Sequence, residues 1–385
     1  RVWPVALCQG LSGLSLGMIV PLLPQLVGVL GLSVQDYGFA TSVYGATRMM
    51  GNYPAAALCE LGRVPVLSTS LGLIGASFAG LTAIKGAMGL VACRAVAGFG
   101  MSGSMTSSTA YAVDVSNVLN RARTVAPVTG AFAAGATVGP MVAGYLSSVT
   151  TMNGTFLASA AVLCAAAGAS RLGIPETARR TAAPTASMGQ TDWQKWAAIM
   201  REPGVPAVVG LTAIFNMIYS GAQITLLPMM LTQNLGWGVA GIGMMFSGMN
   251  FINAGGAPAV GRIADRIGPQ ILLGPACLGI AGALAVLPQA QDLSLLVPAA
   301  GVWALGNTVM MTLPQTFISS AVRPEMRVQA IALLRTAGDL GFLFGGACTG
   351  SLAAATSLGT ALAGTGALIG AAGGLFTAKM MLPVA

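Results

Sequence analysis

Four ionisable side chains lie inside long apolar stretches of the sequence, where charge is rare. Arg48 and Arg94 fall in the second and fourth stretches, and Arg335 and Asp339 lie one helical turn apart in the eleventh. A charge in the middle of a bilayer is costly, so each of the four is a functional candidate by default. A guanidinium donates a fork of hydrogen bonds that fits a carboxylate or a phosphate. Two deep arginines without an obvious deep carboxylate predict an electropositive cleft, and an anionic organic substrate is the preferred hypothesis.

Each of these charges also has a plainer interpretation. Arg48 could extend along the helix toward the membrane surface or contact a helix end, and Arg335 with Asp339 fits a structural latch better than a binding site. Asp339 is the one acid inside a predicted span, and the nearby Arg335 would favour its charged form. The pattern therefore argues against proton coupling, and uniport, exchange or coupling to another ion remain open.

Uncharged polar residues give a second set of candidates. Asn216, Tyr219 and Gln223 recur at helical spacing and predict one shared face. Two further pairs do the same: Asn250 with Asn253, and Trp303 with Asn307. Buried amides must find hydrogen-bond partners. These residues either line a substrate-facing surface or bond neighbouring helices within one half.

Several kinds of chemistry have no residues to perform them. The sequence contains no histidine, and its six cysteines are scattered without a metal-binding spacing. It has no glycine-rich phosphate loop of the ATP-driven kind. We therefore expect no catalytic residue, no metal and no cofactor, and thus no enzyme. The basic residues form no stripe with aromatic residues, so no nucleic-acid partner is expected.

The composition indicates what positions these residues. Hydrophobic residues make up 55% of the 385 positions and charged residues only 7%, with a mean hydropathy of +0.78. A soluble domain carries charge at roughly a quarter of its positions. The sequence therefore predicts an all-α membrane protein with a six-helix bundle in residues 1–172, a linker in 173–203 and a second bundle in 204–385. The twelve predicted spans are 4–30, 37–58, 65–84, 88–112, 124–148, 155–172, 205–231, 238–260, 270–288, 293–318, 328–352 and 356–380.

The loop charges predict an orientation. If the loops are assigned alternately to the two sides, fourteen basic residues fall on one side and only Lys85 on the other. By the positive-inside rule, both termini and the central linker face the cytoplasm, the matrix or the stroma. The host is then a plasma membrane or an organelle inner membrane.

A constant offset of 206 positions relates the two halves. It registers five glycine pairs and one arginine pair over four different segments, which indicates duplication of a six-helix unit. The pairs are Gly62 with Gly268, Gly100 with Gly306, Arg121 with Arg327, Gly135 with Gly341, Gly139 with Gly345, and Gly144 with Gly350.

Short motifs on the predicted helices resemble those of the major facilitator superfamily. Residues 261–269 read GRIADRIGP, similar to the family's loop signature, and Arg94 to Gly98 resembles its R-x-x-x-G pattern. The glycines around Gly139 and Pro140 resemble a pattern associated with antiporters. In the first-half copy of the loop, Cys59 and Glu60 stand where an acid and an arginine are expected.

The resemblance implies two six-helix bundles that move a small solute by alternating access. It implies gating or coupling roles for Arg94, Asp265, Arg266, Gly139 and Pro140, and it leaves the first-half latch weakened. We expect a secondary active or facilitative transporter, similar to drug and organic-solute antiporters, whose partners are a small-molecule substrate and the lipid bilayer. The chain would act as a monomer or within a larger assembly. The alternative is a transport-inactive relative that serves as a structural subunit of a membrane complex.

Overall fold

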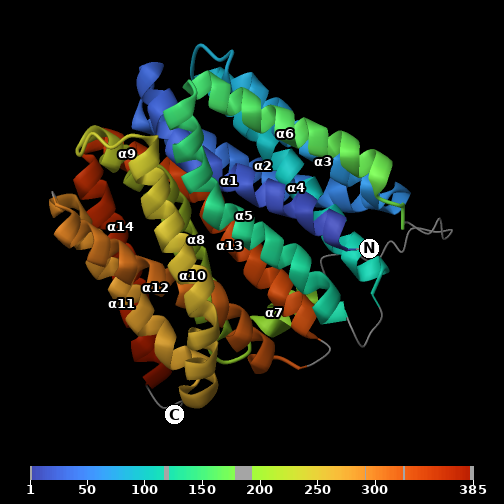
Figure 1. Cartoon of the computed structure of the whole chain (residues 1–385). Coiled ribbons are helices and arrows are strands. Elements are labelled where there is room, and N and C mark those ends of the chain that lie inside the picture. Colours follow the sequence, from blue (N-terminus) through green and yellow to red (C-terminus); the bar gives the residue numbers. More distant parts are fainter. Residues whose placement is uncertain (1, 117–120, 178–192, 291, 324–325, 382–385) are drawn as a thin grey trace. The chain divides into compact units, whose positions relative to one another are not determined.

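The computed structural model describes residues 2–116, 121–177, 193–290, 292–323 and 326–381 (Figure 1). Over these residues the chain is helical, without a β-strand, which confirms the predicted all-α class. Most of the predicted linker, residues 178–192, lies outside the described part of the chain.

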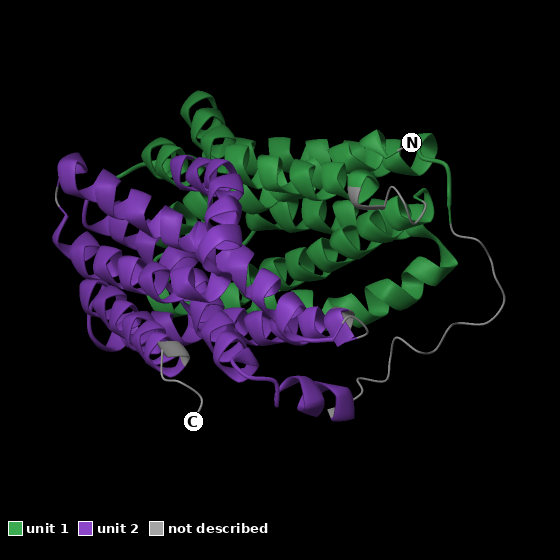
Figure 2. Ribbon diagram, turned by 90° about the horizontal axis from the view of Figure 1, so that it is seen from below, with its two compact units in different colours: residues 1–185, 236–247 green, residues 186–235, 248–385 purple. Residues whose placement is uncertain are grey.

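The helices fall into two compact units, coloured separately in Figure 2: residues 1–185 with 236–247, and residues 186–235 with 248–385. The first unit contains α1 (Trp3–Val29), α2 (Val34–Leu61), α3 (Arg63–Leu81), α4 (Ala87–Asp114), α5 (Arg121–Val149) and α6 (Met152–Gly173). The rest of the chain forms α7 (Trp193–Ile199), α8 (Val205–Ile218), the π-helix η2 (Tyr219–Leu226), α9 (Leu227–Gln233), α10 (Val239–Ile267), α11 (Pro269–Val286), the 3-10 turn η3 (Leu287–Gln289), α12 (Leu293–Ala321), α13 (Arg327–Ala355) and α14 (Leu358–Met381).

Nine helical segments of the described residues are long and apolar enough to cross a membrane. The segments α2, α4 and α10 have 28, 28 and 29 residues, but they are more polar and fall outside this group. The predicted number of twelve spans therefore stays a prediction.

The start of α10 packs with the first unit, whereas the predicted boundary puts all of α10 in the second half. The backbone N–H of Met141 in α5 donates to the Ser247 hydroxyl over 3.1 Å. A Cβ on Gly144 would lie 2.8 Å from the Cα of Ala240. Because Gly144 has no side chain, the two backbones approach closely here.

Local sequence signals explain where several helices begin. Ser33 and Asp36 form a reciprocal cap at the start of α2, in which the Ser33 hydroxyl accepts from the Asp36 N–H over 3.1 Å. At the start of α6 the Thr151 hydroxyl accepts a hydrogen bond from the N–H of Gly154. Gly268 separates α10 from α11 with a φ of +91°, a conformation that side chains disfavour.

The helices pair in the same pattern within each unit. In the first unit α1 packs on α5, α2 on α4, and α3 on both α4 and α6. In the second, α8 and η2 pack on α13, and α11 on both α12 and α14. A hydrogen bond of 3.1 Å from Thr308 to Asn253 joins α12 to α10. These corresponding pairs support the predicted duplication.

Close contacts at the repeated glycines follow the same offset. A Cβ on Gly100 would lie 2.8 Å from the backbone oxygen of Ser70, and one on Gly306 would lie 3.0 Å from that of Ala276. The residues that these Cβ atoms would meet are themselves 206 positions apart: Ser70 and Ile74 next to Gly100, and Ala276 and Ile280 next to Gly306. For the first helix of each half the offset falls to 203, since Gly135 meets Gly10 and Gly341 meets Ala213.

Candidate functional site

The two predicted cleft arginines both lie on the α2–α4 pair. Arg94 stands two turns into α4 and is 5% exposed, with its guanidinium carbon 4.2 Å from the centre of the Tyr44 ring in α2. The half-buried Arg48 follows Tyr44 by one turn. The helices approach here because Gly98 lacks a side chain: a Cβ there would lie 2.6 Å from the Tyr44 oxygen and 3.0 Å from the Arg48 nitrogen.

Arg94 has no ion-pair partner among the described residues of the first unit. Its Nε has no hydrogen-bond partner among the described residues, and the described ion pair of this unit joins Arg63 to Asp114 instead. An effective desolvation penalty of several kcal/mol opposes the burial of such a charge. A cation–π contact returns only about 0.5–2 kcal/mol. The aromatic ring alone therefore does not offset the burial of Arg94.

A buried polar network joins α1 to α4, and none of its residues was among the candidates predicted from the sequence. The Gln9 side-chain oxygen accepts from Ser104 over 2.9 Å and from Ser108 over 3.0 Å. Ser12 and Ser104 share a further bond of 2.7 Å. All four residues are nearly inaccessible. The spacing of Ser104 and Ser108, one turn apart, was the available signal. Because these bonds close on one another, the network fits interhelical packing as well as it fits a solute-facing surface.

In the second unit, the structure brings Gln223 and Asn307 together. The Asn307 amide nitrogen donates to the Gln223 oxygen over 2.6 Å, linking η2 to α12, and both side chains are buried. The other polar atom of the Asn307 side chain, Oδ1, has no hydrogen-bond partner among the described residues. Trp303, one turn before Asn307, is also buried.

Asn216 and Gln223 contact different neighbours, although an unbroken α-helix would place them on one face. Asn216 donates to the Thr212 backbone oxygen over 2.9 Å. Its amide nitrogen also lies close to Gly338 of α13, where an added Cβ would be 3.0 Å away. The cause is the π-helical segment that begins at Tyr219. Its wider turns shift the register after Ile218. Tyr219 itself is half-buried, 6.2 Å from the ring of Phe215 between centroids.

The remaining candidates are spread over several helices. Asn250 and Asn253 are half-buried in α10, and Asp265 and Arg266 are exposed in its last turn. In α13, Arg335 is exposed and Asp339 is half-buried. Gly139 and Pro140 are buried in α5, where a Cβ on Gly139 would lie 2.9 Å from the Cα of Gly17 in α1.

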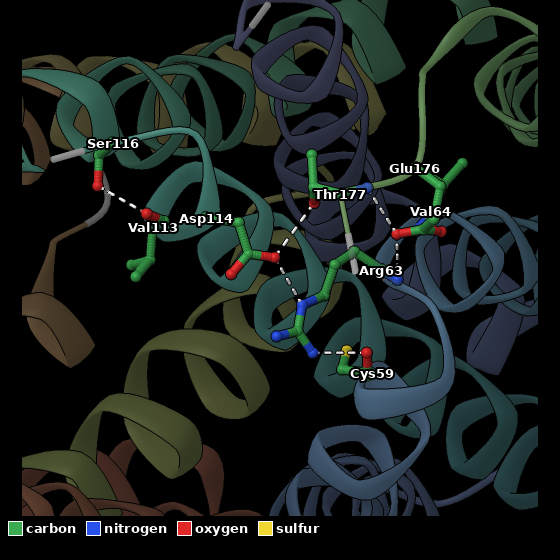
Figure 3. A network of polar contacts seen from close by, with 8 residues as sticks. All are labelled: Cys59, Arg63, Val64, Val113, Asp114, Ser116, Glu176 and Thr177. Carbon is green, nitrogen blue, oxygen red and sulfur yellow. Dashed lines mark hydrogen bonds and ion pairs between the residues drawn. The ribbon is translucent and has the colours of Figure 1, made fainter. Parts of the chain in front are cut away.

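The first half carries a charged network despite its altered loop (Figure 3). The Nε of Arg63 donates to Asp114 at the end of α4 over 3.0 Å. Thr177 donates to the same carboxylate over 3.1 Å. Glu176 accepts from the backbone N–H groups of Arg63 and Val64 over 2.9 and 3.0 Å, and so caps α3. Residues from α4 and from the segment after α6 thus supply acids next to Arg63, where the loop has Cys59 in place of the expected acid.

The sequence matches a family model over residues 5–346, and again over residues 209–383. The model describes the Major Facilitator Superfamily. The chain belongs to this superfamily. Membership in the major facilitator superfamily agrees with the all-helical fold and with the apolar helices that make the chain an integral, multi-pass membrane protein. No curated protein sequence matches the chain.

Solved structures of membrane transporters share this major facilitator fold over nearly the whole chain. A bacterial homolog of the human lysosomal transporter Spinster, crystallised inward-facing and occupied, has a TM-score of 0.80 and 14% identity over 98% of this chain and 96% of its own. The human organic anion transporter MFSD10 (TETRAN) has a TM-score of 0.66 and 18% identity over 97% and 98%. The nucleoside transporter NupG has a TM-score of 0.79 and 12% identity over 99% of both chains. At these identities the likeness concerns the fold alone.

Proposed function

We propose that this chain is a secondary active or facilitative transporter that moves a small organic solute across a membrane by alternating access. Membership in the major facilitator superfamily supports this proposal. The similar solved structures are transporters, and they match this chain over nearly their whole length. These relatives do not favour the alternative of a transport-inactive structural subunit.

The preferred cargo is an anionic organic solute. Arg48 and Arg94 place two positive charges on one helix pair of the first unit. A guanidinium suits carboxylate and phosphate groups. MFSD10, one of the similar structures, is an organic anion transporter, which is compatible with this choice.

Further assignments belong to the same proposal. Uncharged polar residues would contact the solute: Asn216, Tyr219, Gln223, Asn250, Asn253 and Asn307. The gating or coupling set comprises Arg94, Asp265, Arg266, Arg335, Asp339, Gly139 and Pro140. The moving bodies would be residues 1–172 and 204–385, with both termini on the cytoplasmic, matrix or stromal side of a plasma membrane or an organelle inner membrane. Exchange of two solutes, as in an antiporter, is one form of this mechanism.

Reconstitution of the purified chain in liposomes tests the proposal. We expect saturable uptake of labelled succinate or benzenesulfonate, and we expect Arg48→Ala to abolish it while the variant stays folded. Lys85→Ala removes an exposed charge from the loop before α4 and serves as the matched control, with uptake unchanged. If no organic solute enters liposomes that contain folded protein, the proposal is wrong. Normal uptake by Arg48→Ala would remove Arg48 from the site.

A further inference from the structure

The guanidinium of Arg94 combines deep burial with an unused hydrogen-bonding edge. The side chain is 5% exposed, and its Nε lacks a partner among the described residues. The Tyr44 ring contacts the guanidinium at 4.2 Å. A cation–π contact is not a hydrogen bond, and the N–H groups of a guanidinium donate in its plane. The Nε donor of Arg94 is therefore available to a ligand.

The acids of the first unit that the structure describes lie away from Arg94 or bond to other groups. Glu60 is exposed in the last turn of α2, sixteen residues after Tyr44 and about 24 Å further along the helix. Asp36 caps α2 through Ser33 at 2.7–3.0 Å, and Asp114 pairs with Arg63. Asp114 lies twenty residues after Arg94 in the same helix, a separation of about 30 Å. Glu176 caps α3. The compensating negative charge must come from outside this set of side chains.

The duplicated scaffold does not require the charge. At the offset of 206, Ala300 stands in place of Arg94 and Asn250 in place of Tyr44. The contacts of Gly100 and Gly306, one to two turns further along the same helices, are equivalent in the two halves. The second half therefore builds the same helix packing without a buried arginine. This difference favours a role for Arg94 other than holding the bundle together.

We infer that Arg94 is an anion-binding residue, whose Nε and a terminal nitrogen donate to the carboxylate, sulfonate or phosphate of an organic anion while Tyr44 holds the guanidinium plane. The inference rests on the proposed transport function and defines its substrate class. It assigns ligand contact to a residue whose motif implies gating or coupling. The bound anion supplies the charge that the first unit lacks.

Melting of the purified full-length chain in detergent tests this assignment directly. The ligands are succinate and benzenesulfonate, each compared with its uncharged amide. Arg94→Gln removes the charge, Arg94→Lys keeps the charge but loses the fork, and Lys85→Gln is the control that removes an exposed charge. We expect the anions, but not the amides, to raise the melting temperature of the wild type and of Lys85→Gln. The concentration required should rise about tenfold or more in Arg94→Gln, because hydrogen bonds to a charged group are lost.

Stability without ligand separates anion binding from a structural role. Arg94→Gln should melt at the same temperature as the wild type or higher, because an uncompensated buried charge is removed. A lower melting temperature with an unchanged response to anions would overturn the inference. If Arg94→Gln does not fold, Arg94→Lys decides: a weakened response supports the inference and an unchanged one refutes it.

Uptake and lipid controls separate this inference from the proposed function. Loss of succinate uptake by Arg94→Gln liposomes supports the inference, whereas retained succinate uptake overturns it and leaves the transport proposal intact. If wild-type liposomes take up no solute although anions still stabilise the protein through Arg94, transport fails and the anion site stands. If only phosphatidylglycerol, added to phosphatidylcholine micelles, gives the Arg94-dependent stabilisation, the ligand is a lipid headgroup and the solute assignment is overturned.

Discussion

Two glycines of α5 offer a matched test of how the first unit is held together. A Cβ on Gly135 would fall on the backbone oxygen of Gly10 and lie 2.7 Å from the Leu14 nitrogen in α1, whereas Gly130 has nothing within 4 Å. Alanine gains the same helix propensity at both positions, about 1 kcal/mol. That gain cancels when the two variants are compared. The difference then isolates the cost of forcing α1 away from α5, about 1–3 kcal/mol for overpacking.

The free energy of unfolding, measured in mixed micelles with increasing denaturing detergent, gives this difference. Gly130→Ala should be as stable as the wild type or more stable, and Gly135→Ala should be less stable than Gly130→Ala by the stated amount. The duplication adds an independent expectation, since a Cβ on Gly341 would fall on the Ala213 oxygen. Gly341→Ala should therefore lose a similar amount. Equal stabilities of Gly130→Ala and Gly135→Ala would refute close packing of α1 on α5.

Three other contacts give further expected outcomes. Glu176→Gln removes the charged cap of α3 and should lower the unfolding free energy by about 1 kcal/mol; an unchanged value would show that the cap contributes nothing. Asn307→Leu leaves the Gln223 amide buried without a partner and should cost about 1–3 kcal/mol, while replacing both residues by Leu should recover part of the loss; a double variant that loses the sum of both single effects would contradict this coupling. Tyr44→Leu should lower the melting temperature more than Tyr44→Phe. Phenylalanine keeps an aromatic ring against Arg94, and such a cation–π contact contributes about 0.5–2 kcal/mol. Equal effects of the two substitutions would argue against the cation–π contact.

The fold was predictable because membrane insertion imposes simple rules. The long apolar runs predicted the helices, and the glycine offset predicted corresponding contacts such as those of Gly100 and Gly306. At a close helix crossing no other residue is as small as glycine, so the spacing of glycines in the sequence indicates where helices pack closely. The offset of 203 for the first helix became visible only from contacts, because Gly10 meets Gly135 but its counterpart Ala213 is not a glycine.

The site was less predictable, for reasons that differ between residues. Periodicity placed Asn216 with Gln223, but the π-helical segment from Tyr219 to Leu226 breaks the register that this argument assumes. The network of Gln9 with the α4 serines was missed because hydroxyl groups scarcely alter the hydropathy of a helix. The altered loop gave no sign that Arg63 pairs with Asp114, fifty-one positions away in the sequence. Pairings of this kind follow from the packing of helices and leave no local pattern in the sequence.

Counterflow through proteoliposomes tests whether this chain carries a solute by alternating access. Liposomes that contain the purified chain are loaded with unlabelled succinate and diluted into labelled succinate without any ion gradient. An alternating-access carrier exchanges the two pools, so labelled succinate should accumulate transiently above its equilibrium level. If a sample that binds succinate and melts cooperatively shows no more accumulation than protein-free liposomes, the chain is not such a carrier.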